Sequence, residues 1–147
     1  MLTSRDCPCG SGSVYEDCCK RLHDGEPAAS PEALMRSRYS AFVLGLGDYL
    51  QQSHHPETCP ADGDLPDQRW IKLEVIKAVG QQVTFRAWFE VDGRLGVMQE
   101  RSRFEQIQGR WLYHSGDFLP AEPVWPRNEA CWCGSGRKAK KCHPDDC

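Results

Sequence analysis

Hydrophobic and polar positions predict one amphipathic helix in the first half of the chain. Its apolar residues recur every three or four positions, the spacing of one buried helical face: Met35, Tyr39, Phe42 and Leu46. Ser30 and Pro31 come just before this pattern, and serine at the cap with proline at the first helical position is a common helix start. Gly45 and Gly47 end or break the pattern. We therefore expect a helix that starts after Ser30.

Beyond residue 70 the apolar period changes to two, which is typical of strands. Two runs alternate apolar with polar side chains, namely Ile71, Leu73 and Val75, and then Val83, Phe85, Ala87, Phe89 and Val91. Trp88 falls among the polar positions of the second run. Asp92-Gly93 is a strong hairpin signal before a third run over 95–107, and Gln108-Gly109 serves the turn into 110–115. The pattern predicts an antiparallel meander.

A helix followed by a meander predicts an α+β domain in which the helix covers one face of a curved sheet. Residues 48–53 suggest a short helical turn, whereas 20–29 read as a polar connector without regular structure. Residues 54–67, with three prolines and Gly63, are expected to form a loop. Phe118 to Pro126 also contains three prolines and predicts an extended linker.

One cysteine pattern occurs at both ends of the chain. Residues 7–19 and 131–143 both read C-x-C-G-S-G-x5-C, followed by Cys19 in the first copy and His143 in the second. Thiolate and imidazole are the ligands that zinc prefers, and four of them form a closed structural site. The sequence thus predicts two zinc ions per chain, held by Cys7, Cys9, Cys18 and Cys19 at one end and by Cys131, Cys133, Cys142 and His143 at the other.

Disulfides and a redox pair are the alternatives to zinc. Nine cysteines leave one unpaired, and the usual redox spacing is C-x-x-C rather than C-x-C. Cys147 could replace His143 as a ligand. His54, His55 and Cys59 could suggest a further metal site, but they lie in a proline-rich loop without a fourth ligand at a recognised spacing. Four ligands leave no open coordination position, so we expect no catalytic residue at either zinc.

The duplicated motif resembles SEC-C, the zinc-binding tail known from the preprotein translocase motor SecA. With residues 34–42, LMRSRYSAF, and 100–104, ERSRF, between its two copies, the chain resembles the uncharacterised bacterial YchJ family over nearly its whole length. That resemblance implies a cone-shaped middle domain with the fold of nuclear transport factor 2. The expected domains are a zinc knuckle over 1–22, the middle domain over 23–126 and a second knuckle over 127–147. Because small metal modules have little core, we expect each knuckle to unfold separately from the middle domain.

Composition is ordinary, with 39% hydrophobic and 27% charged residues, and no apolar run approaches the length of a membrane helix. The first six residues are polar and lack the apolar region of an export signal, so a cytoplasmic location is expected. Motifs for nucleotide binding, hydride transfer and nucleophilic catalysis are missing from the sequence. These features favour a binding protein over an enzyme.

The two knuckles differ in charge. Residues 1–19 carry one cation and three acids, whereas 127–147 carry five cations and three acids. Four of these cations form a compact cluster that could bind an anionic partner: Arg137, Lys138, Lys140 and Lys141. The cluster could instead offset the negative charge of the zinc–thiolate centre. In SecA the resembled tail contacts the acidic export chaperone SecB, which implies an acidic protein partner here; a ribosome or nucleic acid is the other partner class.

A second candidate site is a polar pocket in the middle domain. Strand alternation places Glu100 and Ser102 on the same face as Phe104, and a buried carboxylate needs a partner such as Arg36 or Arg38. The possible pocket residues are Arg36, Arg38, Tyr39, Glu100 and Ser102, with His114 nearby. Three functions stay open: a zinc-binding adaptor, an enzyme or small-ligand-binding protein that uses this pocket, and a redox- or zinc-responsive thiol protein.

Overall fold

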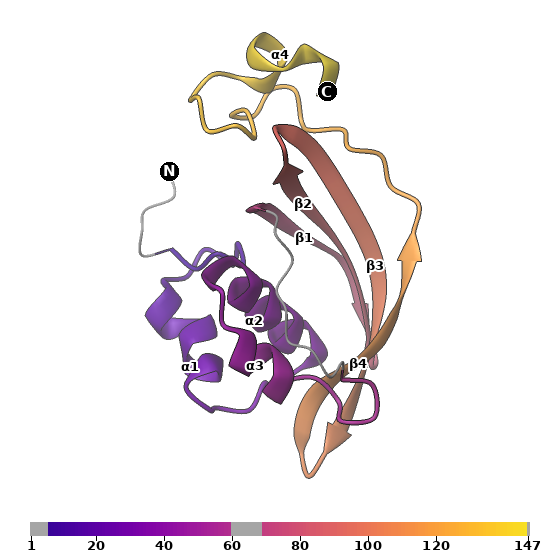
Figure 1. Ribbon diagram of the computed structural model, residues 1–147. Helices are drawn as coiled ribbons and strands as arrows, with labels where there is room; N and C mark the ends of the chain where they lie inside the picture. The colour runs from indigo at the N-terminus through magenta and orange to yellow at the C-terminus, as the bar shows by residue number, and fades with distance from the viewer. Residues whose placement is uncertain (1–5, 60–68, 147) are drawn as a thin grey trace.

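The computed structural model describes residues 6–59 and 69–146, and it has the predicted α+β architecture. Short 3₁₀ turns at Tyr15–Asp17 and Pro144–Asp146 accompany four helices and four strands among these residues: α1 (Cys19–His23), α2 (Pro31–Leu44), α3 (Gly47–Gln52), β1 (Arg69–Val79), β2 (Gln82–Val91), β3 (Arg94–Ile107), β4 (Arg110–Leu119) and α4 (Ala139–Cys142). Helices α1 to α3 gather on the concave side of the curved sheet, and α4 lies beyond one end of it (Figure 1).

Helix α2 forms where the sequence predicts it. The Ser30 hydroxyl accepts a hydrogen bond from the Ala33 N–H at 3.1 Å, and Pro31 occupies the first turn. Gly45 ends the helix with φ of 74°, a left-handed conformation that glycine adopts without steric cost. Helix α2 has 14 residues, and no helix of the described residues combines the length and apolarity needed to cross a bilayer.

The sheet is an antiparallel meander in the order β1-β2-β3-β4, as predicted. Both predicted hairpins are present. Asp92 and Gly93 have φ of 52° and 76°, and Gln108 and Gly109 have φ of 52° and 79°. Two successive positive φ values are typical of the type I′ turn, whose twist matches that of paired strands.

The main core lies between α2 and the concave face of the sheet. Tyr39 is 4% exposed and packs with Phe85 and Phe104, as expected from the helical pattern. Phe42 is only half-buried and contacts the Trp70 ring, with the centroids 5.8 Å apart. The helix therefore covers the sheet mainly through residues 33–39, and less through its last turn.

The strand alternation fails at two positions, and both lead to a second core on the other face of the sheet. Ile71 packs in this second cluster rather than beside Leu73, because the pairing of β1 with β2 shifts between Trp70 and Lys72. Trp88, expected on the polar face, is 3% exposed because Trp125 and the C-terminal knuckle cover it. The linker beyond β4 folds the chain end back onto the sheet.

The segment read as an irregular connector begins with a helix, so that prediction was wrong. Helix α1 covers Cys19–His23, so it begins at the last cysteine of the first motif. His23 joins this helix to its neighbours: its Nδ1 lies 2.6 Å from the Tyr15 hydroxyl, and its Nε2 lies 2.8 Å from the Ser37 carbonyl oxygen. Tertiary contacts thus stabilise a short polar helix that its composition does not favour.

Candidate metal centres

The first motif brings four sulfur atoms together at the N-terminal end. Cys7, Cys9, Cys18 and Cys19 place their sulfurs within 4.8 Å of one another. The Sγ of Cys18 lies 3.6 Å from that of Cys9 and 3.9 Å from that of Cys19. A tetrahedral ion with metal–sulfur bonds near 2.3 Å would hold its sulfurs about 3.8 Å apart. The cluster fits such an ion, and these cysteines are free thiols rather than disulfides.

The second motif forms a matching centre with one nitrogen ligand. Cys131, Cys133, Cys142 and His143 meet the same 4.8 Å limit. The Sγ atoms of Cys133 and Cys142 are 3.5 Å apart, and the His143 Nδ1 lies 3.1 Å from the Cys131 Sγ. Nδ1 is therefore the nitrogen positioned to join three sulfurs around an ion.

The Gly-Ser-Gly turn has the same role in both centres. Gly12 and Gly136 have φ of 88° and 83°, which explains why glycine recurs there. The serine between the glycines faces a ligand sulfur: Ser11 Oγ lies 3.2 Å from the Cys18 Sγ, and Ser135 Oγ lies 3.3 Å from the Cys142 Sγ. The sequence showed that this serine recurs but not that it contacts sulfur.

Close contact between the thiols of each cluster shifts their pKa values in opposite directions. Hydrogen bonds with Cys19 and Cys9 lower the pKa of Cys7, and the hydrogen bonds with Cys7 and Cys9 raise that of Cys19. In the second centre, hydrogen bonds from Ser135 lower the pKa of Cys133 to about 6, whereas burial raises that of Cys131 to about 11. If all of these neighbouring thiols were ionised, the thiolates would repel one another strongly. A bound cation offsets that repulsion.

The N-terminal centre is built into the surface of α2. The Ser40 hydroxyl lies 3.5 Å from the Cys7 Sγ and donates to the Cys19 Sγ at 3.3 Å. Arg36 donates from Nη1 to the Cys9 carbonyl at 2.8 Å. Cys9 is fully buried. The ligands thus share a packed interface with the helix that covers the sheet.

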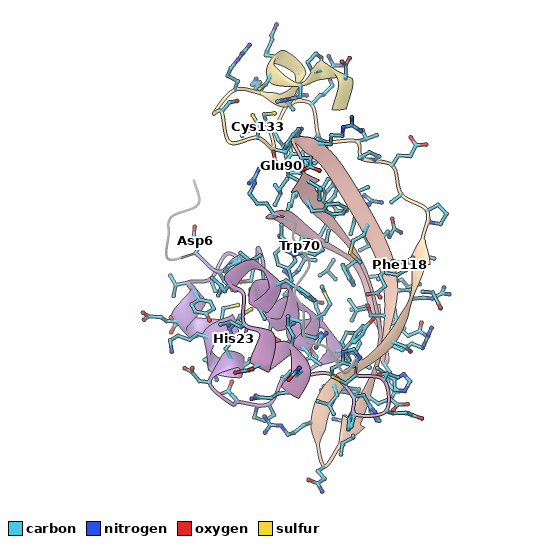
Figure 2. The ribbon with its side chains drawn as sticks, in the orientation of Figure 1. Asp6, His23, Trp70, Glu90, Phe118 and Cys133 are labelled. Carbon is cyan, nitrogen blue, oxygen red and sulfur yellow. The ribbon has the colours of Figure 1, made fainter. Side chains whose placement is uncertain are left out.

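The C-terminal centre packs against tryptophan side chains rather than against α2. Trp88 and Trp125 pack edge to face with ring centroids 5.7 Å apart, and the Trp125 Nε1–H donates to the Ala130 carbonyl at 3.0 Å. Trp132 is buried and lies against the His143 ring. Figure 2 shows Cys133 at the end of the sheet that carries Glu90.

The basic cluster lies on the surface of this knuckle. Arg137, Lys138 and Lys141 are exposed and Lys140 is half-buried. The Arg137 guanidinium donates to the Lys141 carbonyl at 2.9 Å, which holds the loop against α4. The ion pairs found in the described part of the chain do not include these four cations.

Three of the five residues predicted for a central pocket form a buried polar network. Glu100 accepts hydrogen bonds from Ser102 and Tyr113, both at 2.8 Å. Arg38 stacks over the Tyr113 ring at 4.8 Å and donates to the Ser53 hydroxyl at 2.7 Å. Burial lowers the pKa of Arg38 to about 10. The network satisfies its own polar groups, which suits a structural role.

The other two predicted pocket residues lie elsewhere. Arg36 points to the N-terminal knuckle, where it binds Glu32 and the Cys9 carbonyl, because it lies on a different face of α2 from Arg38. Tyr39 packs in the apolar core with its ring against Trp70. Tyr113, which completes the network, was missed because its strand pattern alone does not reveal a partner on β3.

Comparisons with known proteins agree with this architecture. A family model for the YchJ middle NTF2-like domain matches residues 30–116, and one for the SEC-C motif matches 127–143. A UPF0225 protein of Shewanella sp. strain MR-7 is 38% identical, covering 97% of this chain and 98% of the relative. One from Streptomyces coelicolor is 48% identical, covering 77% and 95%.

A solved structure is also similar. The SEC-C motif containing protein RPA3114 from Rhodopseudomonas palustris is 36% identical and superposes with a TM-score of 0.65, covering 78% of this chain and 98% of that one. The α+β fold and the SEC-C assignment thus have support from both sequence and structure.

Proposed function

Since the chain belongs to the UPF0225 family with a YchJ-like middle domain, and since both ends form compact thiol clusters, we propose that it is a zinc-binding adaptor protein. Its C-terminal knuckle contacts an anionic partner. The observation that carries the proposal is the contrast between two matched metal frameworks, of which one presents acids and the other presents exposed cations.

Zinc is the metal that best suits these ligands. Four thiolates, or three thiolates and one imidazole, form the closed tetrahedral sites of structural zinc. The sulfur spacings match such a site at both ends. Two zinc ions per chain follow, with no position left open for catalysis. Metal analysis of the reduced protein tests this: a molar ratio of two supports the assignment, and a ratio of one or less contradicts it.

The anionic partner is favoured because the ion pairs of the described residues leave out the four cations of the basic cluster. Cations that are not engaged in ion pairs keep their full attraction for an external anion, and a metal-stiffened loop fixes their geometry. Charge compensation for the thiolates accounts for some cations but leaves the outward position of Lys138 and Lys141 unexplained. An acidic protein surface is the preferred partner because the knuckle offers point charges on a small area.

The test uses two defined anions and two sets of variants. Binding of a fluorescent polyglutamate peptide and of single-stranded RNA is measured by anisotropy at low and at physiological salt. Lys138→Gln, Lys140→Gln and Lys141→Gln together should weaken peptide binding at least tenfold at low salt, with zinc content unchanged. The matched control, Glu16→Gln with Asp17→Asn on the other knuckle, should leave it unchanged. Equal binding by the triple variant would contradict the proposal, and tighter binding of RNA would move the partner to nucleic acid.

The thiol-responsive alternative uses the same eight ligands and is separated by a different measurement. If the clusters act as redox sensors, mild oxidation of the zinc-loaded protein should release both ions and form disulfides. An adaptor should keep its zinc under those conditions, because the bound ion occupies every thiolate.

A further inference from the structure

A third cluster of metal-ligand side chains lies where the loop after α3 meets β3 and β4. His55, Glu57, Glu105 and His114 each offer a ligand atom, and these atoms lie within 4.8 Å of one another. Glu57 and His114 are 57 residues apart in the sequence, yet their Oε2 and Nε2 atoms are 3.0 Å apart. No local spacing in the sequence could reveal this cluster, because two members come from the loop and two from strands. The loop trio considered earlier contributes only His55.

The backbone fixes this loop to β4. The His55 N–H donates to the Tyr113 carbonyl at 2.7 Å, and the Tyr113 N–H donates to the Ser53 carbonyl at 2.9 Å. The Thr58 hydroxyl donates to the His114 carbonyl at 2.6 Å. These three hydrogen bonds place the loop beside the strand before any ligand binds, so the cluster is preorganised.

The hydrogen bonds of the two histidines assign them different roles. The His55 Nδ1 accepts the Glu57 N–H at 3.0 Å, so the proton of the neutral ring lies on Nε2, which donates to the Glu105 Oε2 at 3.2 Å. The His114 Nδ1 faces the Ser115 hydroxyl at 2.9 Å, which leaves Nε2 directed at Glu57. When the ring proton is on Nδ1, where the Ser115 oxygen can accept it, the His114 Nε2 offers a lone pair to an ion that takes the place of the proton between Nε2 and Glu57. His55 is placed to orient a carboxylate.

We propose that Glu57, Glu105 and His114 bind one divalent transition-metal ion, and that His55 orients Glu105 toward it. Two carboxylates and one imidazole form a ligand set for ions such as manganese, iron or zinc, unlike the thiolate sets of the knuckles. Metal bonds near 2.1 Å hold tetrahedral ligand atoms about 3.4 Å apart, a few tenths of an ångström more than the 3.0 Å between Glu57 and His114. The exposed carboxylates need only small rotations to bring in the remaining ligand.

Charge favours a cation at this position. In the ion pairs of the described residues, Glu57 and Glu105 have only these histidines as partners, and no lysine or arginine neutralises them. The guanidinium of nearby Arg103 pairs with Asp117 at 2.7 Å and donates to the Ser115 hydroxyl at 3.1 Å, rather than to Glu57 or Glu105. Two carboxylates within a few ångströms of each other gain from a shared divalent ion.

The site differs from the knuckles in its access to solvent. Glu105 and His114 also line a hollow of about 330 Å³, with Gln81, Gln82, Arg103 and Phe104. Three protein ligands leave at least one coordination position open, and this hollow gives water or a small anion room to reach it. The proposal is independent of the adaptor function, since it shares no residue with either knuckle.

Manganese is the probe, because it prefers oxygen and nitrogen ligands and does not displace zinc from thiolates. The full chain, loaded with two zinc ions, is titrated with Mn²⁺, and the free ion is followed by electron paramagnetic resonance. One saturable Mn²⁺ per chain is expected. If the free signal rises in proportion to added Mn²⁺ at every concentration up to the millimolar range, the proposal is overturned.

Variants locate the ion. Glu57→Gln and Glu105→Gln are near-isosteric changes of exposed side chains, and each should abolish saturable binding while circular dichroism stays unchanged. His55→Leu should weaken binding about tenfold without changing the stoichiometry, the size of effect usual for a partner that orients a metal ligand. The matched controls Glu122→Gln and His54→Gln should bind as the unchanged protein does. Unchanged binding by Glu105→Gln, or equal loss in the controls, would show that Mn²⁺ is held nonspecifically and would refute the site.

Discussion

The two knuckles share a metal framework and differ in how they join the middle domain. The N-terminal knuckle has three cysteines that are at most 2% exposed, and Ser40 and Arg36 of α2 contact its cysteines directly. In the C-terminal knuckle only Cys131 is buried among the ligands, and the contact with the sheet runs through tryptophans beside the metal centre. One motif is thus a part of the helical layer, and the other is docked on the opposite face of the sheet.

This contrast shows that two copies of one motif can have different surroundings. The ligand spacing determines the fold of the loop, which explains the matching turns and serine contacts at both ends. The residues between the ligands, and the surfaces available beside each end, determine what the loop contacts. The first knuckle is placed to support stability, and the second is placed to present its outer face to solvent.

The largest expected difference is in the effect of losing one ligand. Cys9→Ala should lower the free energy of unfolding of the middle domain by about 3–5 kcal/mol. The variant site lacks one ligand and binds zinc poorly, which leaves buried thiolates beside α2 without a neutralising cation. Cys133→Ala should lower it by about 1 kcal/mol or less. Urea denaturation followed by circular dichroism measures both. Equal effects would mean that the two knuckles are coupled to the middle domain alike, as the sequence alone suggested.

A smaller effect should follow from breaking the tryptophan contact. Trp125→Ala should lower the free energy of unfolding by about 2–3 kcal/mol. This is at or just below the usual range for a buried tryptophan, because the linker that carries Trp125 can partly fill the cavity. Zinc content should stay at two per chain, since the ligands themselves are unchanged. Loss of one zinc ion in this variant would instead show that docking on the sheet is needed to form the second centre.

Chelation should separate the two centres by rate. Because Cys133, Cys142 and His143 are partly exposed, a chelator should remove the C-terminal zinc about tenfold faster than the N-terminal one. The expected trace is biphasic, and Cys133→Ala should lack the fast phase. A single phase accounting for both ions would argue against the difference in burial.

The smallest expected effect on stability comes from removing one hydrogen bond between the middle domain and each knuckle. Arg36→Gln should destabilise the protein by about 1 kcal/mol, because Arg36 binds the Cys9 carbonyl at 2.8 Å from a partly buried position. Arg69→Gln is the matching variant on the other side, since Arg69 donates to the Trp132 carbonyl at 3.4 Å from a more exposed position. It should lower the stability by only a few tenths of a kcal/mol. Thermal melting of the two variants, side by side, checks the order.

Local signals in the sequence predicted the elements well and predicted long-range contacts poorly. The cap at Ser30 and the turns at Asp92-Gly93 and Gln108-Gly109 depend on a few adjacent residues, and all three are as predicted. Trp88 and Ile71 could not be placed, because their burial depends on a bulge and on a chain end that returns from more than thirty residues away.

The metal-ligand clusters show the same division. Each knuckle follows from spacing within one short segment, so the sequence predicts which residues could hold a metal there. The cluster of Glu57, Glu105 and His114 joins a loop to two strands, and its members have no common spacing. Arg36 and Arg38 are two positions apart on one helix, and only the structure shows that they face different neighbours.

The tryptophans of the second core make the intrinsic fluorescence of the protein sensitive to the state of the C-terminal knuckle. Trp88, Trp125 and Trp132 are three of its five tryptophans, and all three lie together beneath the C-terminal metal centre. The emission of an indole depends on the polarity of its surroundings, so opening this knuckle would shift the intrinsic fluorescence of the whole molecule toward longer wavelengths. An unlabelled sample could therefore report, in real time, whether that end is closed against the sheet.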